Sequence, residues 1–174
     1  NFRLSKVELK PAYAKLDAKE LHEAKERVEI YNRVDEWVGL EWIGANKDMA
    51  TQAIEKTNHY ITYGAKKYDS YGFKSIRYNN LYDGIDVLFE IHPKGGLEFT
   101  FFVAPGADIS KIQYRYNGQQ NLVLKDNKKI ILKTGIEDMW ESDLHAYYAN
   151  GEKVSFEYKL QNGIISLVPH EQID

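Results

Sequence analysis

The side chains best suited to chemistry lie along one face of a predicted β-hairpin in the middle of the chain. Side chains of a strand alternate between its two faces, and neighbours on one face are about 6.5–7 Å apart. Carboxylates and an imidazole at that spacing can hold a metal ion, or act as acid and base on a sugar. The same alternation is typical of any strand with one face in solvent. The candidate binding residues on this face are Asp86, Glu90, His92 and Glu98.

The turn before this hairpin offers oxygen ligands around a glycine, Gly84. Calcium takes six to eight oxygen ligands, often from such loops, although this turn lacks the acidic spacing of an EF-hand. Asn and Asp are also the residues that ordinary turns use to bond their own backbone. Calcium is therefore the one cofactor that the sequence allows, and we otherwise expect none. The candidate metal ligands are Asn80, Asp83 and Asp86.

Three tryptophans are candidate binding residues of another kind. Exposed aromatic rings can form a flat platform that stacks on sugars, whereas buried rings belong to a core. The residues in question are Trp37, Trp42 and Trp140. The five histidines show no zinc-ligand spacing, and neither a nucleophile elbow nor a Walker-type phosphate loop occurs. We therefore expect a domain without catalytic activity.

The hairpin itself is predicted from strict alternation. Residues 85, 87, 89 and 91 are apolar, as are residues 97, 99, 101 and 103, so each strand has one wholly apolar face. Pro93, Lys94, Gly95 and Gly96 form the link and supply the positive φ angles of a tight turn.

The rest of the chain predicts further short strands. A helix is expected from Leu16 to Arg27, capped by Asp17 with Glu20 as its capping-box partner. We expect β structure from Trp37 onward, a polar connection over Asp48–Asn58 and a turn at Asp69–Gly72. About ten strands separated by turn residues indicate a mainly β fold, an antiparallel β-sandwich with a short N-terminal helix. We expect one domain over residues 1–174, with 1–36 as an N-terminal strand and helix appendage and 37–174 as the main β region.

Composition excludes several classes of protein. The chain has 174 residues, 43% of them hydrophobic, and a net charge of −3, which argues against nucleic acid as a partner. It contains no cysteine, so disulfides and thiolate zinc sites are excluded. No run of about 18 apolar residues occurs, so we expect no membrane insertion. The chain begins with Asn1, which we interpret as the start of a processed fragment.

A longer pattern in the centre resembles a known but uncharacterised family. It runs Tyr78-x-Asn80-x-Tyr82-x-Gly84-Ile85-Asp86, then Gly96-Leu97-Glu98-Phe99, then Val103-Ala104-Pro105-Gly106-Ala107-Asp108, and then Arg115-Tyr116-x-Gly118. It resembles an N-terminal β-rich domain of secreted bacterial surface proteins, which often continue into SBBP or PKD-like repeats and a C-terminal gliding-motility (type IX secretion) signal. Thr100, Asp83 and Ile109 depart from the family's usual Asp, Pro and Pro.

The resemblance implies a secreted or cell-surface location, with a signal peptide removed. It implies a non-catalytic structural or binding module of a multidomain bacterial protein, for adhesion or scaffolding. The expected partners are other domains of the same polypeptide, a polysaccharide or a surface protein. Two alternatives stay open: a carbohydrate-binding module, and a glycan-acting hydrolase that uses Asp86, Glu90 and Glu98.

Overall fold

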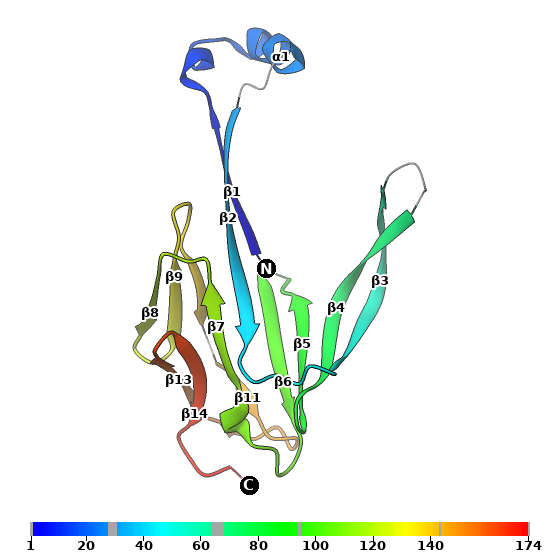
Figure 1. Cartoon of the computed structure of the whole chain (residues 1–174), viewed down its shortest axis with the longest axis vertical. Helices are drawn as coiled ribbons and strands as arrows, with labels where there is room; N and C mark the ends of the chain where they lie inside the picture. The colour runs from blue at the N-terminus through cyan, green and yellow to red at the C-terminus, as the bar shows by residue number, and fades with distance from the viewer. Residues whose placement is uncertain (1, 28–30, 64–67, 94, 143, 174) are drawn as a thin grey trace. The chain divides into compact units, whose positions relative to one another are not determined.

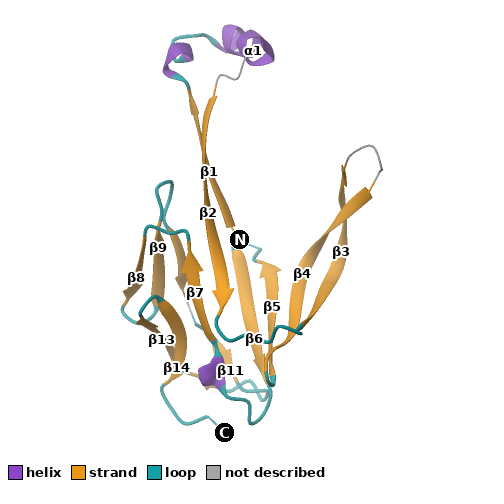
Figure 2. Ribbon diagram, in the orientation of Figure 1, coloured by secondary structure: helices purple, strands orange, loops and turns teal. Residues whose placement is uncertain are grey.

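The computed structural model describes residues 2–27, 31–63, 68–93, 95–142 and 144–173. Its elements are overwhelmingly antiparallel strands, with one α-helix near the N-terminus (Figure 1; Figure 2). This confirms the predicted class, a mainly β, sandwich-like fold with a short helix. The chain divides into two compact units, residues 1–41 with 114–170 (unit 1) and residues 42–113 with 171–174 (unit 2). The expectation of a single domain stays a prediction.

Unit 1 contains a five-stranded sheet in the order β1-β2-β7-β14-β13, a three-stranded sheet in the order β10-β9-β8, and the β11-β12 pair. Their bounds are β1 Phe2–Leu9, β2 Tyr31–Trp42, β7 Gln113–Asn117, β8 Asn121–Lys125, β9 Lys129–Lys133, β10 Met139–Ser142, β11 Ala146–Tyr147, β12 Lys153–Val154, β13 Phe156–Gln161 and β14 Ile164–Pro169. The inward side chains of the two larger sheets form the core of this unit, including Val38, Tyr114, Ile130, Leu132, Tyr158 and Ile165.

The helix α1, Ala18–Arg27, lies at the far end of the ribbon formed by β1 and β2 (Figure 1). A short 3-10 turn, η1 Pro11–Tyr13, precedes it. Asp17 accepts from the N–H groups of Lys19 and Glu20, and its own N–H donates to Glu20 Oε2 at 3.0 Å. The capping box predicted from the sequence is therefore confirmed.

Unit 2 is built on a four-stranded sheet in the order β3-β4-β5-β6. Its strands are β3 Ala50–Tyr63, β4 Tyr68–Tyr82, β5 Ile85–Ile91 and β6 Leu97–Val103, followed by the 3-10 turn η2 Ile109–Lys111. The predicted hairpin of β5 and β6 is confirmed, with Val87 opposite Phe101 and Phe89 opposite Phe99. Gly95 and Gly96 have φ angles of 91° and 92°, as the turn requires, whereas Lys94 lies outside the described residues.

Two expectations about this unit were wrong. The segment Asp48–Asn58 is mostly β3 and not a polar connection, and Asp69–Gly72 lies within β4 and not in a turn. The long pairing of β3 with β4 contains a register shift between Lys56 and Tyr60, which interrupts the alternation that a strand normally displays. In unit 1, β2 begins at Tyr31, before Trp37, and the strand β10 had not been predicted.

Candidate functional site

The turn from β4 to β5 positions the first candidate residue, Asp86. Tyr78 pairs with Val87 and Tyr82 with Ile85, and the register shift between them leaves Asn80 with a φ angle of 55°. The Asn80 N–H then donates to Asp86 Oδ1 at 2.6 Å. This hydrogen bond closes the turn, with the Asp86 carboxylate as the acceptor.

The second oxygen of Asp86 is paired with Arg77 on β4. The guanidinium donates from Nε at 3.2 Å and from Nη2 at 2.7 Å to Asp86 Oδ2. The Asn80 N–H, together with this guanidinium, holds the pKa of Asp86 below its ordinary value, against the opposing effect of desolvation. Asp86 is therefore an ionised, hydrogen-bonded carboxylate at neutral pH.

A groove of about 310 Å³ lies beside this ion pair. The Arg77 guanidinium carbon is 4.7 Å from the centre of the Phe102 ring, a cation–π contact. Phe102 is directly opposite Asp86 and is 45% exposed. We call this hollow the Arg77 groove; it is lined by Arg77, Gly84, Asp86, Phe102, Val103 and Ala104.

The other predicted acidic residues lie further along the same face. Glu90 pairs directly with Glu98 across the hairpin, and both are exposed. Four residues of strand, about 13 Å, separate Asp86 from Glu90. His92 is half-buried at the hairpin end, where its N–H donates to Gly96 O at 3.1 Å. The structure thus brings Glu90 and Glu98, two of the four candidates, together and holds Asp86 apart from them.

Calcium binding at this turn stays a prediction. Asp83 is exposed. The Asn80 N–H contacts Asp86 Oδ1, and the Arg77 guanidinium contacts Asp86 Oδ2, so both oxygens of Asp86 already have partners. A calcium ion there would share Asp86 with a fixed positive charge. Within the described part of the chain, no cluster of three His, Asp or Glu side chains is close enough to hold a metal ion.

The three tryptophans lie in different environments. Trp42 packs edge-on against Phe99 and Phe101, with ring centres 5.9 and 5.5 Å away, and thus covers part of the apolar face of the β5–β6 hairpin. Trp37 on β2 is 57% exposed and Trp140 on β10 is 62% exposed. They belong to different sheets, so the structure does not join them into one platform.

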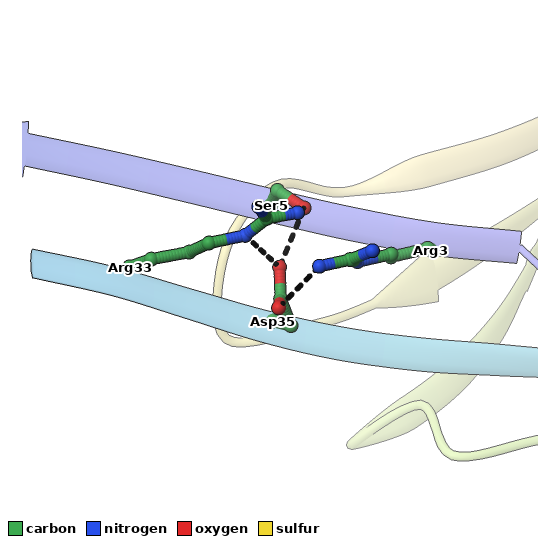
Figure 3. Close-up of polar contacts among 4 residues, drawn as sticks. All are labelled: Arg3, Ser5, Arg33 and Asp35. Carbon is green, nitrogen blue, oxygen red and sulfur yellow. Dashed lines mark hydrogen bonds and ion pairs between the residues drawn. The ribbon is translucent and has the colours of Figure 1, made fainter. Parts of the chain in front are cut away.

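A polar cluster on the β1–β2 ribbon escaped the sequence reasoning (Figure 3). Asp35 Oδ2 accepts from Arg3 at 2.7 Å, and Oδ1 accepts from Ser5 at 2.6 Å and from Arg33 at 3.0 Å. These three donors, the Arg3 contact foremost, hold the pKa of Asp35 far below its ordinary value. All four residues share one face because Ser5 pairs with Asp35 in the ribbon's register. The cluster marks that register, which a one-residue slip would destroy.

A second missed cluster lies between the sheets of unit 1, around Glu141 on β10. Its Oε1 accepts from the hydroxyls of Tyr114 at 2.5 Å and Tyr158 at 3.0 Å, and its Oε2 accepts from Tyr116 at 2.9 Å. All three tyrosines are buried: Tyr114 is 0% exposed, Tyr158 2% and Tyr116 8%. We call this group the Glu141 cluster. It joins the five-stranded sheet to the three-stranded sheet through polar contacts inside the core.

Burial governs the ionisation of the Glu141 cluster. Burial raises the pKa of Tyr116 well above its ordinary value, and the neighbouring Glu141 carboxylate raises it further; Tyr114 behaves in the same way. Burial also raises the pKa of Glu141, although the three hydroxyl donors oppose this effect. The folded state therefore keeps Tyr114 and Tyr116 neutral at pH values where an unfolded chain ionises them.

We expect alkaline pH to destabilise the chain through these tyrosines. Their stabilising contribution is present below pH 10, the ordinary tyrosine pKa, and is lost as the pH rises toward the folded value. Each tyrosine contributes a slope of about 1.4 kcal/mol per pH unit well above pH 10. Urea unfolding at several pH values measures the free energy of unfolding against pH. In Tyr116→Phe this free energy should fall less steeply with pH than in the wild type, by that amount. Tyr147→Phe, at a 62% exposed position, is the control and should keep the wild-type slope; equal slopes in all three proteins would contradict the expectation.

The comparison with protein families covers almost the whole chain. A model described as a domain of unknown function, DUF7948, matches residues 4–173. The chain belongs to the DUF7948 family. No curated protein and no solved structure matches it. The DUF7948 match includes both units, the Arg77 groove and the Glu141 cluster, so all these features lie within the family's span.

The residues of the central pattern, which lies within the DUF7948 match, have backbone roles in the structure. A Cβ on Gly84, which has a φ angle of 72°, would lie 2.9 Å from the Cβ of Ala107. The Ala104 N–H donates to Gly84 O at 2.9 Å, and Asp108 accepts from the Ser110 N–H at 3.0 Å. These contacts fix the turn and the exit of the hairpin.

The helix α1 is too short and too polar to cross a bilayer, as are the other helical segments that the structure describes.

Proposed function

We propose that this domain is a non-catalytic structural or binding module of a secreted, cell-surface, multidomain bacterial protein, with a role in adhesion or scaffolding. The observation that supports this most is the use of the central pattern: Gly84, Ala104, Ala107 and Asp108 shape the backbone of the turn and of the hairpin exit through close packing and hydrogen bonds. In this proposal the parent protein carries SBBP or PKD-like repeats and a type IX secretion signal linked to gliding motility. The partners are neighbouring domains, a polysaccharide or a surface protein.

Surface exposure on intact cells tests the proposed location. An antibody raised against this domain should label unpermeabilised cells that express the full-length protein, and added protease should remove that signal. A cytoplasmic marker protein, protected in the same sample, is the control. Labelling that appears only after permeabilisation would contradict the proposal.

A glycan-acting hydrolase is the second candidate, because Glu90 and Glu98 lie directly opposite one another. Opposed strand residues have Cβ atoms about 4.5–5.5 Å apart, which permits the carboxyl separation of a retaining enzyme. Under the main proposal, the chain releases no reducing sugar from bacterial or host polysaccharides. Release that disappears in Glu98→Gln, with the unfolding midpoint unchanged, would favour the hydrolase instead.

A further inference from the structure

One edge of the unit 2 sheet is formed by β6, which pairs with β5 and with no other strand that the structure describes. His92 N–H donates to Gly96 O, and Ala104 N–H donates to Gly84 O, in the same register as the strand pairs between them. In an antiparallel pair, hydrogen-bonded and non-hydrogen-bonded pairs alternate. The even-numbered residues of β6 thus bond to β5. The N–H and C=O groups of the odd-numbered residues of β6 point away from β5, toward the edge of the sheet.

The two edges of this sheet differ in their protection against further pairing. The opposite edge, β3, carries Lys56, a register shift after it, and Glu55 with a φ angle of 52°. Such charges and irregularities discourage the addition of another strand. In contrast, β6 reads LEFTFFV, pairs without a shift and has Glu98 as its single charge. Its sequence and regularity suit an edge that accepts a strand.

The edge strand β6 lines part of the Arg77 groove through Phe102 and Val103, and Phe102 lies on the same face of β6 as Glu98. Arg77 and Asp86 neutralise each other, so the groove offers a guanidinium plane, the Phe102 ring, Val103 and Ala104 to an apolar or aromatic side chain. Four residues away, Glu98 faces Glu90, and like charges in directly opposed positions repel. A cation on an added strand would relieve that repulsion.

We infer that β6 accepts an extended peptide strand from a partner protein, with an aromatic or apolar residue opposite Phe102 and a Lys or Arg opposite Glu98. The two partner residues are then four positions apart on one face of the added strand. Main-chain hydrogen bonds to the edge supply affinity, and the groove and Glu98 supply selectivity. This inference rests on the proposed function and names the surface and the chemistry of its partner.

The experiment uses fluorescein-labelled synthetic peptides and the intact chain, with anisotropy as the readout. An antiparallel strand meets Phe102 before Glu98, so the probe has the core Tyr-Thr-Val-Thr-Lys between Ser-Thr flanks. Its control has Thr-Tyr-Val-Thr-Lys, which moves the ring to the opposite face. We expect saturable binding of the probe and at least tenfold weaker binding of the control. Equal binding of both peptides, or no binding of the probe at millimolar concentration, would overturn the inference.

Two variants separate edge pairing from a loss of folding. Val103→Pro removes an N–H that points to the edge and is unused by β5, so it should weaken probe binding at least tenfold, whereas Val103→Thr should not. Glu98→Lys should lose the probe and bind a peptide with Glu in place of its Lys, a gain that misfolding does not produce. If instead the chain self-associates in sedimentation and Val103→Pro abolishes this, a second copy is the occupant and the partner-peptide inference fails. Failure of peptide binding leaves the surface-labelling test of the proposed function untouched.

Discussion

Replacing Glu141 by Ala should lower the free energy of unfolding by about 3–5 kcal/mol. The hydroxyls of Tyr114, Tyr116 and Tyr158 would lose the carboxylate that accepts from them, and all three rings are buried. A buried hydroxyl without an acceptor costs about 1–3 kcal/mol, and the truncated side chain also leaves a cavity between the sheets.

Chemical denaturation at pH 7, followed by tryptophan fluorescence, measures this loss. Glu137→Ala is the matched control, because Glu137 is exposed. The Thr134 hydroxyl donates to the backbone carbonyl of Glu137, and the substitution retains this hydrogen bond. It should change the free energy of unfolding by less than about 0.5 kcal/mol. If Glu141→Ala unfolds within 1 kcal/mol of the wild type, the cluster contributes little and our account of it is wrong.

Replacing Gly118 by Ala should be as damaging, for a different reason. Gly118 follows β7 with a φ angle of +96°, and a Cβ there would lie 2.1 Å from the carbonyl oxygen of Trp37 on β2. That atom belongs to the backbone of a paired strand, so relief requires β2 or β7 to shift. Strain at the positive φ angle and overpacking each cost about 1–3 kcal/mol, which predicts a total of about 3–5 kcal/mol.

Gly151→Ala separates the clash from the backbone strain. Gly151 has a φ angle of +85°, and nothing lies within 4 Å of its hypothetical Cβ, so only the strain of about 1–2 kcal/mol applies. The difference between the two midpoints of denaturation therefore reports the close approach to Trp37. Similar midpoints would show that β2 and β7 separate easily at this point. If Gly118→Ala accumulates only as insoluble protein while Gly151→Ala stays folded, the expectation is also met.

Local patterns predicted the central hairpin and the helix cap well. The alternation in β5 and β6 needs no distant partner to be recognised, and Asp17 and Glu20 lie within one turn of each other. The same reasoning failed at Gly72, which was expected in a turn. A Cβ on Gly72 would lie 2.8 Å from Thr57 Oγ1, so this glycine permits close approach across β3 and β4 instead. A single sequence does not distinguish these two uses of glycine.

The candidate site was predicted less well, because its contacts join distant residues. Asp86 was correctly singled out as a polar residue on the hairpin, but its pairing with Arg77 follows from the register of β4 with β5. The Glu141 cluster was missed entirely, since β10 is four residues long and shows no alternation. Its tyrosines lie 17, 25 and 27 residues away along the chain. Tyr114 and Tyr116 at alternate positions were the one local sign of an inward polar pair.

The division of unit 1 into residues 1–41 and 114–170 has a consequence for how the protein is made. On the ribosome, β1 and β2 emerge long before β7. Glu41 emerges 74 residues before Arg115, its hydrogen-bond donor in the folded protein. The sheet of unit 2 is contiguous in sequence and is complete by then. Nascent β2 therefore exposes an unsatisfied edge throughout the synthesis of the inserted segment, and closing that loop is a slow step by contact-order arguments. Chaperone capture during translation should concentrate on this interval.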